Sequence, residues 1–133
     1  MITHLSHLTI FVKNEGEALH FYLEKLGFEK RMDATFGGFR WLSVAPAAQK
    51  EVQLVLLETR TMFDGQAAEK FESLMADGKI GGGVFCTDDC QRDYETLSAR
   101  GVKFRGPPEK KPWGMQATFS DDSNNWFSLT QPR

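Results

Sequence analysis

The chain has few cysteines, no long apolar run and little net charge. Only two of its 133 residues are cysteine, Cys86 and Cys90, and no second pair completes a zinc-ribbon pattern. Sixteen Lys and Arg face 18 Asp and Glu, so the net charge of −2 gives no basic field to attract nucleic acid. No stretch approaches the ~20 apolar residues of a membrane span. We therefore expect neither nucleic acid nor membrane as a partner.

The first segment, MITHLSHLTIFV, lacks the basic-then-apolar pattern of a secretory signal and favours a cytoplasmic protein. Cys86 falls in a predicted strand and Cys90 at the start of the next helix, a placement that does not favour a disulfide. A helix N-terminus lowers a thiol pKa and would make Cys90 reactive. Burial, the commoner situation for a free thiol, would make it inert.

The chain does contain the same order of elements twice. Residues 8–58 read strand, helix and three strands, and residues 83–130 repeat that order. Each half alone would bury too small a core to be stable. We therefore expect an α+β fold in which two tandem βαβββ modules form a cup-shaped sheet around a central cavity, with the helices on the outer face.

The modules belong to one domain, residues 1–133. Module 1 covers about residues 5–60 and module 2 about 80–131. A connector at about 61–79 holds one helix, which ends at Gly78. Within module 2, the proline-rich segment 106–114 is predicted to be a stiff loop.

Turn and cap residues mark the ends of these elements. Asn14 is a good N-cap for the first helix, and Gly27 suits the left-handed position after its last turn. Asp88 or Asp89 caps the second helix. Asn124, in the turn before the last strand, can adopt a left-handed conformation.

Alternation of side chains along the strands predicts which residues line the cavity. If Leu8, Ile10 and Val12 pack under the helices, the residues between them face the opposite way. The same parity gives an inward set of His7, Thr9, Phe11, Phe39, Trp41, Gln53, Val55, Gly82, Val84, Cys86, Trp126, Ser128 and Thr130. So much aromatic surface with few polar groups suits a small, partly apolar ligand.

Three segments resemble a known family: HLTIFV at 7–12, FY followed by LGF at 21–28, and DDSNNWFSL at 121–129. Over about residues 5–131 the chain resembles the vicinal oxygen chelate superfamily, which includes glyoxalase I, extradiol dioxygenases, fosfomycin-resistance enzymes and bleomycin-resistance proteins. FRWLSVAP, GGGVF and NWFSLTQP are similar to a bacterial subset described as glyoxalase-like. The resemblance implies a homodimer.

The resemblance also implies a divalent metal, such as Zn²⁺, Ni²⁺, Mn²⁺ or Fe²⁺, held by four strand residues that are typically His or Glu. His7 matches the first position, Gln53 or Val55 the second, Gly82 the third and Ser128 the fourth. Glycine and valine offer no side-chain ligand, and an imidazole, an amide and a hydroxyl are a poor set for these metals. We therefore expect that no metal is bound.

Two functions follow. The first is a glyoxalase-like pocket protein with a degenerate metal site, which binds an aromatic or amphipathic small molecule through Thr9, Phe11, Trp41, Gln53, Trp126 and Ser128. The alternative is a divalent-metal-dependent lyase or dioxygenase with an atypical site centred on His7, as catalytic base or metal ligand. We favour the first, because no inward Glu is available as a base. No sequence feature favours a purely structural or regulatory module.

Overall fold

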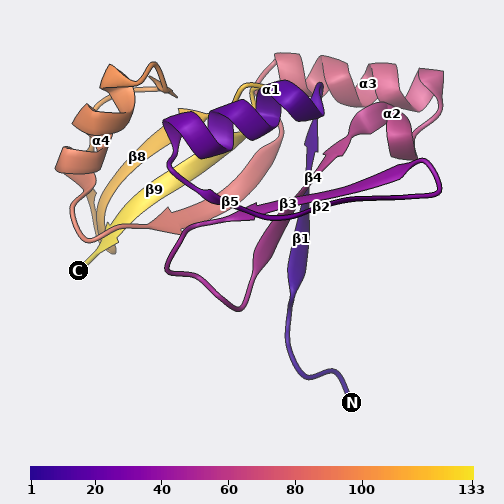
Figure 1. The fold of residues 1–133 in the computed structure, drawn as a ribbon. Helices are drawn as coiled ribbons and strands as arrows, with labels where there is room; N and C mark the ends of the chain where they lie inside the picture. The colour runs from indigo at the N-terminus through magenta and orange to yellow at the C-terminus, as the bar shows by residue number, and fades with distance from the viewer. The chain divides into compact units, whose positions relative to one another are not determined.

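The computed structural model describes all 133 residues, which divide into two compact units, Met1–Glu72 and Ser73–Arg133 (Figure 1). Each unit contains one β-sheet with a helix on one of its faces, and the first unit also includes a short helix and most of a longer one after its last strand. The predicted α+β class and the repeated order of elements are confirmed. None of the helices combines the length and the apolar composition that a membrane crossing requires.

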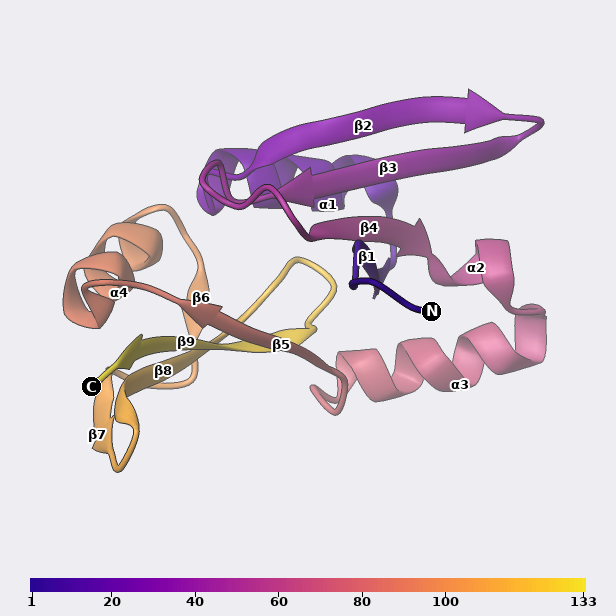
Figure 2. The ribbon, with the colours of Figure 1, turned by 90° about the horizontal axis from the view of Figure 1, so that it is seen from below.

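The first unit has four strands: β1 (His7–Val12), β2 (Glu29–Phe36), β3 (Phe39–Ala45) and β4 (Gln53–Glu58). Their order is β1-β4-β3-β2, with β1 parallel to β4 and the other neighbours antiparallel. Figure 2 shows β2 and β3 as a long hairpin with α1 (Glu15–His20) behind the sheet. The helix side of this sheet is apolar and buried, with Ile10, Val12, Leu42, Val44, Leu54 and Leu56.

Helix α1 begins as predicted, because the Asn14 side chain accepts a hydrogen bond of 2.8 Å from the Glu17 N–H. It continues into a π-helical turn, η1 (Phe21–Lys25), in which the Leu26 N–H donates to the Phe21 carbonyl. This wider turn was not predicted. Gly27 then reverses the chain with a φ of 76°, a conformation that favours glycine.

Two helices follow β4. The short α2 (Thr59–Met62) was not predicted, whereas α3 (Gly65–Ala76) is the predicted connector helix and is followed by Gly78 at a φ of 71°. The Thr59 hydroxyl donates to the Glu72 carboxylate at 2.6 Å. This bond joins α2 to α3 within the first unit.

The second unit has five strands: β5 (Gly81–Cys86), β6 (Lys103–Phe104), β7 (Glu109–Lys111), β8 (Gly114–Ser120) and β9 (Trp126–Pro132). The order is β5-β9-β8-β6, and β7 pairs with β8. Strand β7 lies inside the segment 106–114, so the prediction of a simple loop there was wrong. Helix α4 (Cys90–Ala99) is capped by Asp89, whose carboxylate accepts from the Arg92 N–H at 3.0 Å.

Aromatic rings fill the core between this sheet and α4. Phe127 lies 4.9 Å from Phe85 and 5.7 Å from Phe119, centroid to centroid. Tyr94 of α4 meets Phe104 edge to face at 4.9 Å. The other face of β9 carries Trp126, which is half-buried, and Ser128 and Thr130, which are buried.

Candidate functional site

Four side chains gather on the face of the first sheet opposite α1. The strand register places His7 of β1 beside Gln53 of β4. The Ser43 hydroxyl of β3 donates to Gln53 Oε1 at 2.7 Å, so Ser43 points to the same side. Trp41 lies two residues before Ser43 and shares its direction. We call His7, Trp41, Ser43 and Gln53 the His7 face.

The two rings of the His7 face contact each other. The centroids of His7 and Trp41 are 5.3 Å apart with an interplanar angle of 74°, an edge-to-face arrangement that suits the charge distribution of aromatic rings. The Nδ1 atom of His7 is hydrogen-bonded to Ser6 Oγ at 2.9 Å. Phe39 extends the aromatic surface, 6.3 Å from Trp41. Both rings of the pair are half-buried, which leaves part of each accessible.

Thr9 and Phe11 continue along β1 on the same side. Thr9 is exposed. Phe11 packs 5.1 Å from Phe63 and 5.2 Å from Phe71, so the chain that follows β4 contacts this end of the strand. Phe11 is thus part of an aromatic cluster of the first unit.

Trp126 and Ser128 lie on the second sheet, on the face opposite the phenylalanine core. The Trp126 ring covers Gly81, where an added Cβ would lie 2.6 Å from the ring, and the Arg105 guanidinium is 5.5 Å from its centroid. Ser128 is buried, and the register pairs it with Val84 of β5.

The predicted inward direction of Gly82 was wrong. The pairing of β5 with β9 shifts between Gly81 and Gly83, and a Cβ on Gly82 would lie 2.2 Å from the ring of Phe127 in the core. The reason is a β-bulge, which adds one residue and reverses the parity. Gly81 therefore takes the place assigned to Gly82, again without a side chain.

The residues present do not fit a divalent metal. No group of three or more His, Cys, Asp or Glu is placed to hold a metal ion. The polar groups that accompany His7 on its face are the Gln53 amide and the Ser43 hydroxyl. Amides and hydroxyls are weak ligands for the divalent metals that the sequence resemblance implies.

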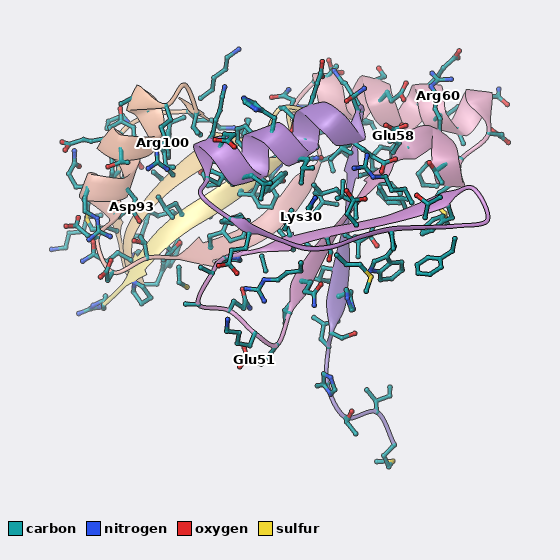
Figure 3. All side chains as sticks on the ribbon, in the orientation of Figure 1. Lys30, Glu51, Glu58, Arg60, Asp93 and Arg100 are labelled. Carbon is teal, nitrogen blue, oxygen red and sulfur yellow. The ribbon has the colours of Figure 1, made fainter.

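A carboxylate cluster, not predicted as a group, lies on the helix side of the first sheet. Glu58, labelled in Figure 3, accepts from the Glu15 N–H at 2.9 Å at the start of α1. Burial, and then the nearby Glu58, raises the pKa of Glu15 above its ordinary value. Arg40 binds both carboxylate oxygens of Asp33 at 2.9 Å and holds the pKa of that group at about 2. The contact of Glu58 with the Glu15 N–H holds the start of α1 against the sheet. Because these carboxylates lie on the helix side, the His7 face has none.

Both cysteines are free. Cys90 is buried, and burial raises the pKa of its thiol above the ordinary value, so the alternative of a reactive Cys90 was wrong. After burial, the nearby carboxylate of Asp93 raises this pKa further. Cys86 is exposed on β5.

A separate open groove of about 680 Å³ lies in the second unit, beside the hairpin of β7 and β8. Its lining consists of Lys110, Lys111, Pro112, Gly114, Met115, Gln131, Pro132 and Arg133. None of the predicted site residues lines it.

Ser43 is the member of the His7 face that sequence reasoning missed. The parity that places Trp41 inward also places Ser43 inward, so the signal was present. Its flanking residues, Leu42 and Val44, are apolar, so a single serine between them does not by itself indicate a site.

Comparisons with known proteins agree with this architecture. A family model described as the Glyoxalase/Bleomycin resistance protein/Dioxygenase superfamily matches residues 4–129. The crystal structure of UcmS2 is 44% identical with a TM-score of 0.94 and 98% of both chains covered. TnmS3, an antibiotic binding protein from Streptomyces sp. CB03234, is 33% identical with a TM-score of 0.80, over 99% of this chain and 98% of that chain. The uncharacterized protein YurT of Bacillus subtilis (strain 168) is 31% identical over 123 residues, 92% of this chain and 94% of YurT. The chain therefore belongs to the glyoxalase/bleomycin resistance protein/dioxygenase superfamily, as its sequence segments predicted.

Proposed function

We propose that the chain binds a planar aromatic small molecule of the antibiotic type, reversibly and without a metal, on the His7 face. The observation that supports this most is the half-buried pair of Trp41 and His7. The Trp41 ring is half-buried and lies beside the rings of His7 and Phe39, contacts that position it before a ligand arrives. Pre-organised aromatic rings bind planar ligands at a low cost in conformational entropy.

The similarity to TnmS3 supports the antibiotic class. That protein is an antibiotic binding protein, and it shares 33% of its residues with this chain over nearly the full length of both. Antibiotics with fused aromatic rings have the planar shape that the Trp41 ring and the nearby Phe39 suit.

The chemistry of the His7 face favours binding over catalysis. A lyase or dioxygenase of this superfamily would need metal ligands and a base, whereas this face supplies one imidazole, one amide and one hydroxyl. Such groups suit hydrogen bonding to a ligand. The homodimer and the cytoplasmic location stay predictions.

A thermal-shift screen with planar aromatic antibiotics tests the proposal. A ligand at 100 times its Kd should stabilise the folded state by about 2.7 kcal/mol and raise Tm by roughly 10 °C for a chain of this size. The Trp41→Ala variant should lose the shift. Trp113→Ala is the matched control, because Trp113 is an exposed ring in the second unit. A panel without any stabilising compound would contradict the proposal.

A further inference from the structure

Ser43 is a hydroxyl residue buried in an apolar strand. Its exposed fraction is 0%, and its neighbours in β3, Leu42 and Val44, are also fully buried. A buried hydroxyl is costly unless it forms a hydrogen bond. Ser43 forms one by donating to Oε1 of Gln53 at 2.7 Å. The bond crosses from β3 to β4 and ends on the His7 face.

This bond sets the orientation of the Gln53 carboxamide. The backbone of Gln53 is fixed by its N–H, which donates to the Ser6 carbonyl at 2.9 Å, and by its pairing with His7. Because Oε1 is turned to Ser43, the amide nitrogen is turned away from it. A carboxamide has an acceptor end and a donor end, and here the acceptor end is already in use.

We propose that Ser43 holds Gln53 as a hydrogen-bond donor for an acceptor oxygen, such as a carbonyl, on the aromatic ligand. Gln53 is the specificity-determining residue, and Ser43 is a positioning residue that acts through it. The inference rests on the proposed function, since it assigns ligand chemistry to the same face. Trp41 contributes affinity for any planar ring, and Gln53 selects among rings by their polar groups.

The expected selectivity follows from hydrogen-bond energetics. A neutral hydrogen bond between protein and ligand changes affinity by about fivefold. A ligand with an N–H group at the same place would put two donors face to face and leave both without an acceptor. That lowers affinity more than the absence of a hydrogen bond does. Among ligands of equal shape, the His7 face should therefore bind one with an acceptor most tightly, an apolar one less tightly, and one with a donor most weakly.

Three tricyclic probes of nearly the same shape test this ranking. 9-Fluorenone-2-carboxylate has a carbonyl, fluorene-2-carboxylate has a CH₂, and carbazole-2-carboxylate has an N–H at the corresponding ring position. We expect the wild type to bind the fluorenone about fivefold more tightly than the fluorene, and the carbazole most weakly. The infrared carbonyl stretch of bound fluorenone should move to lower wavenumber.

Variants separate orientation from simple contact. In Ser43→Ala the amide can rotate, so the fluorenone-to-carbazole affinity ratio should fall towards one while fluorene affinity is retained. In Gln53→Glu the carboxylate can still accept from Ser43 but presents an acceptor, so the ratio should invert in favour of carbazole. Gln49→Glu makes the same chemical change at an exposed site after β3 and should leave the ratio unchanged.

The outcomes distinguish the two proposals. If all three probes bind the wild type equally, the donor role of Gln53 is wrong and the aromatic-binding function stands. If the carbazole binds best, the amide has the opposite orientation and the inference is overturned. If none of the probes binds at all, the proposed function fails for planar aromatic ligands and the inference falls with it.

Discussion

The turn between β8 and β9 depends on one carboxylate, and removing it should destabilise the second unit. Asp121 accepts hydrogen bonds from the N–H groups of Ser123 and Asn125, both at 2.9 Å, and from Asn125 Nδ2 at 3.0 Å. Asp121 is 6% exposed, and Ser123 and Asn125 are 0% and 1% exposed. In Asp121→Ala, three buried donors lose their acceptor.

The size of the effect can be estimated from these contacts. A hydrogen bond to a charged group contributes roughly 1.5–3 kcal/mol, and an unpaired buried donor costs about 1–3 kcal/mol. Because the turn can relax towards water, the three losses will not add fully. We expect the free energy of unfolding to fall by about 3–4 kcal/mol, among the larger effects of single substitutions.

Urea unfolding measures this change. The midpoint for Asp121→Ala should fall while the slope with urea stays constant, as for a loss of stability in an unchanged fold. Asp77→Ala, an exposed aspartate after α3, is the control and should change the free energy by about 0.5 kcal/mol or less. A loss below about 1 kcal/mol in Asp121→Ala would refute the assignment of three buried hydrogen bonds to this carboxylate.

Three further predictions concern other parts of the chain. A thiol reagent such as DTNB should label exposed Cys86 quickly and buried Cys90 only after unfolding; equal labelling in the folded protein would contradict the burial of Cys90. Burial raises the pKa of Glu15, so the folded state binds a proton on this carboxyl more tightly than the unfolded state does. The protonated carboxyl therefore contributes to stability at low pH, and that contribution is lost as pH rises through the raised pKa. Glu15→Gln should therefore gain stability relative to the wild type between about pH 4 and about pH 7, as measured by urea unfolding at both pH values. Gly114→Ala should destabilise by more than about 3 kcal/mol by the same measurement, because its Cβ would lie 2.0 Å from a backbone oxygen, whereas Gly106→Ala has open space and should be tolerated.

Much of the fold could be predicted from local patterns. The alternation of Leu8, Ile10 and Val12 with the residues between them is a direct consequence of strand geometry. Ile10 and Val12 are buried on the helix side as expected, whereas Leu8, at the start of β1, is exposed. Asn14 and Asn124 were identified from their chemistry, and both are confirmed, the second by its φ of 69°.

Other features depend on contacts that a single sequence does not reveal. Three consecutive glycines gave no sign of which one forms the bulge, so Gly82 was assigned to the wrong face. The effect of burial on the Cys90 thiol depends on the packing of α4 against β9, where its sulfur lies 3.5 Å from the Leu129 carbonyl. Ser43 and Gln53 lie ten residues apart on different strands, so their hydrogen bond can be recognised only once the pairing of β3 with β4 is known.

In the His7 face, too, some features could be predicted from the sequence and others depend on three-dimensional contacts. Parity alone places His7, Trp41 and Gln53 on one side of the first sheet. The edge-to-face contact of His7 with Trp41 and the orientation of the Gln53 amide come from three-dimensional packing. Types of residue could thus be predicted, and their hydrogen-bonding roles could not.

The most direct test of metal-free aromatic binding is calorimetric titration of the protein in EDTA with the strongest ligand from the thermal-shift screen. The account predicts saturable binding that EDTA leaves unchanged. Affinity should fall at least about tenfold in Trp41→Ala, as expected for the loss of ring stacking and of apolar contact area, and should be retained in Trp113→Ala. Binding that requires an added divalent metal, or that is equally strong in Trp41→Ala, would contradict it.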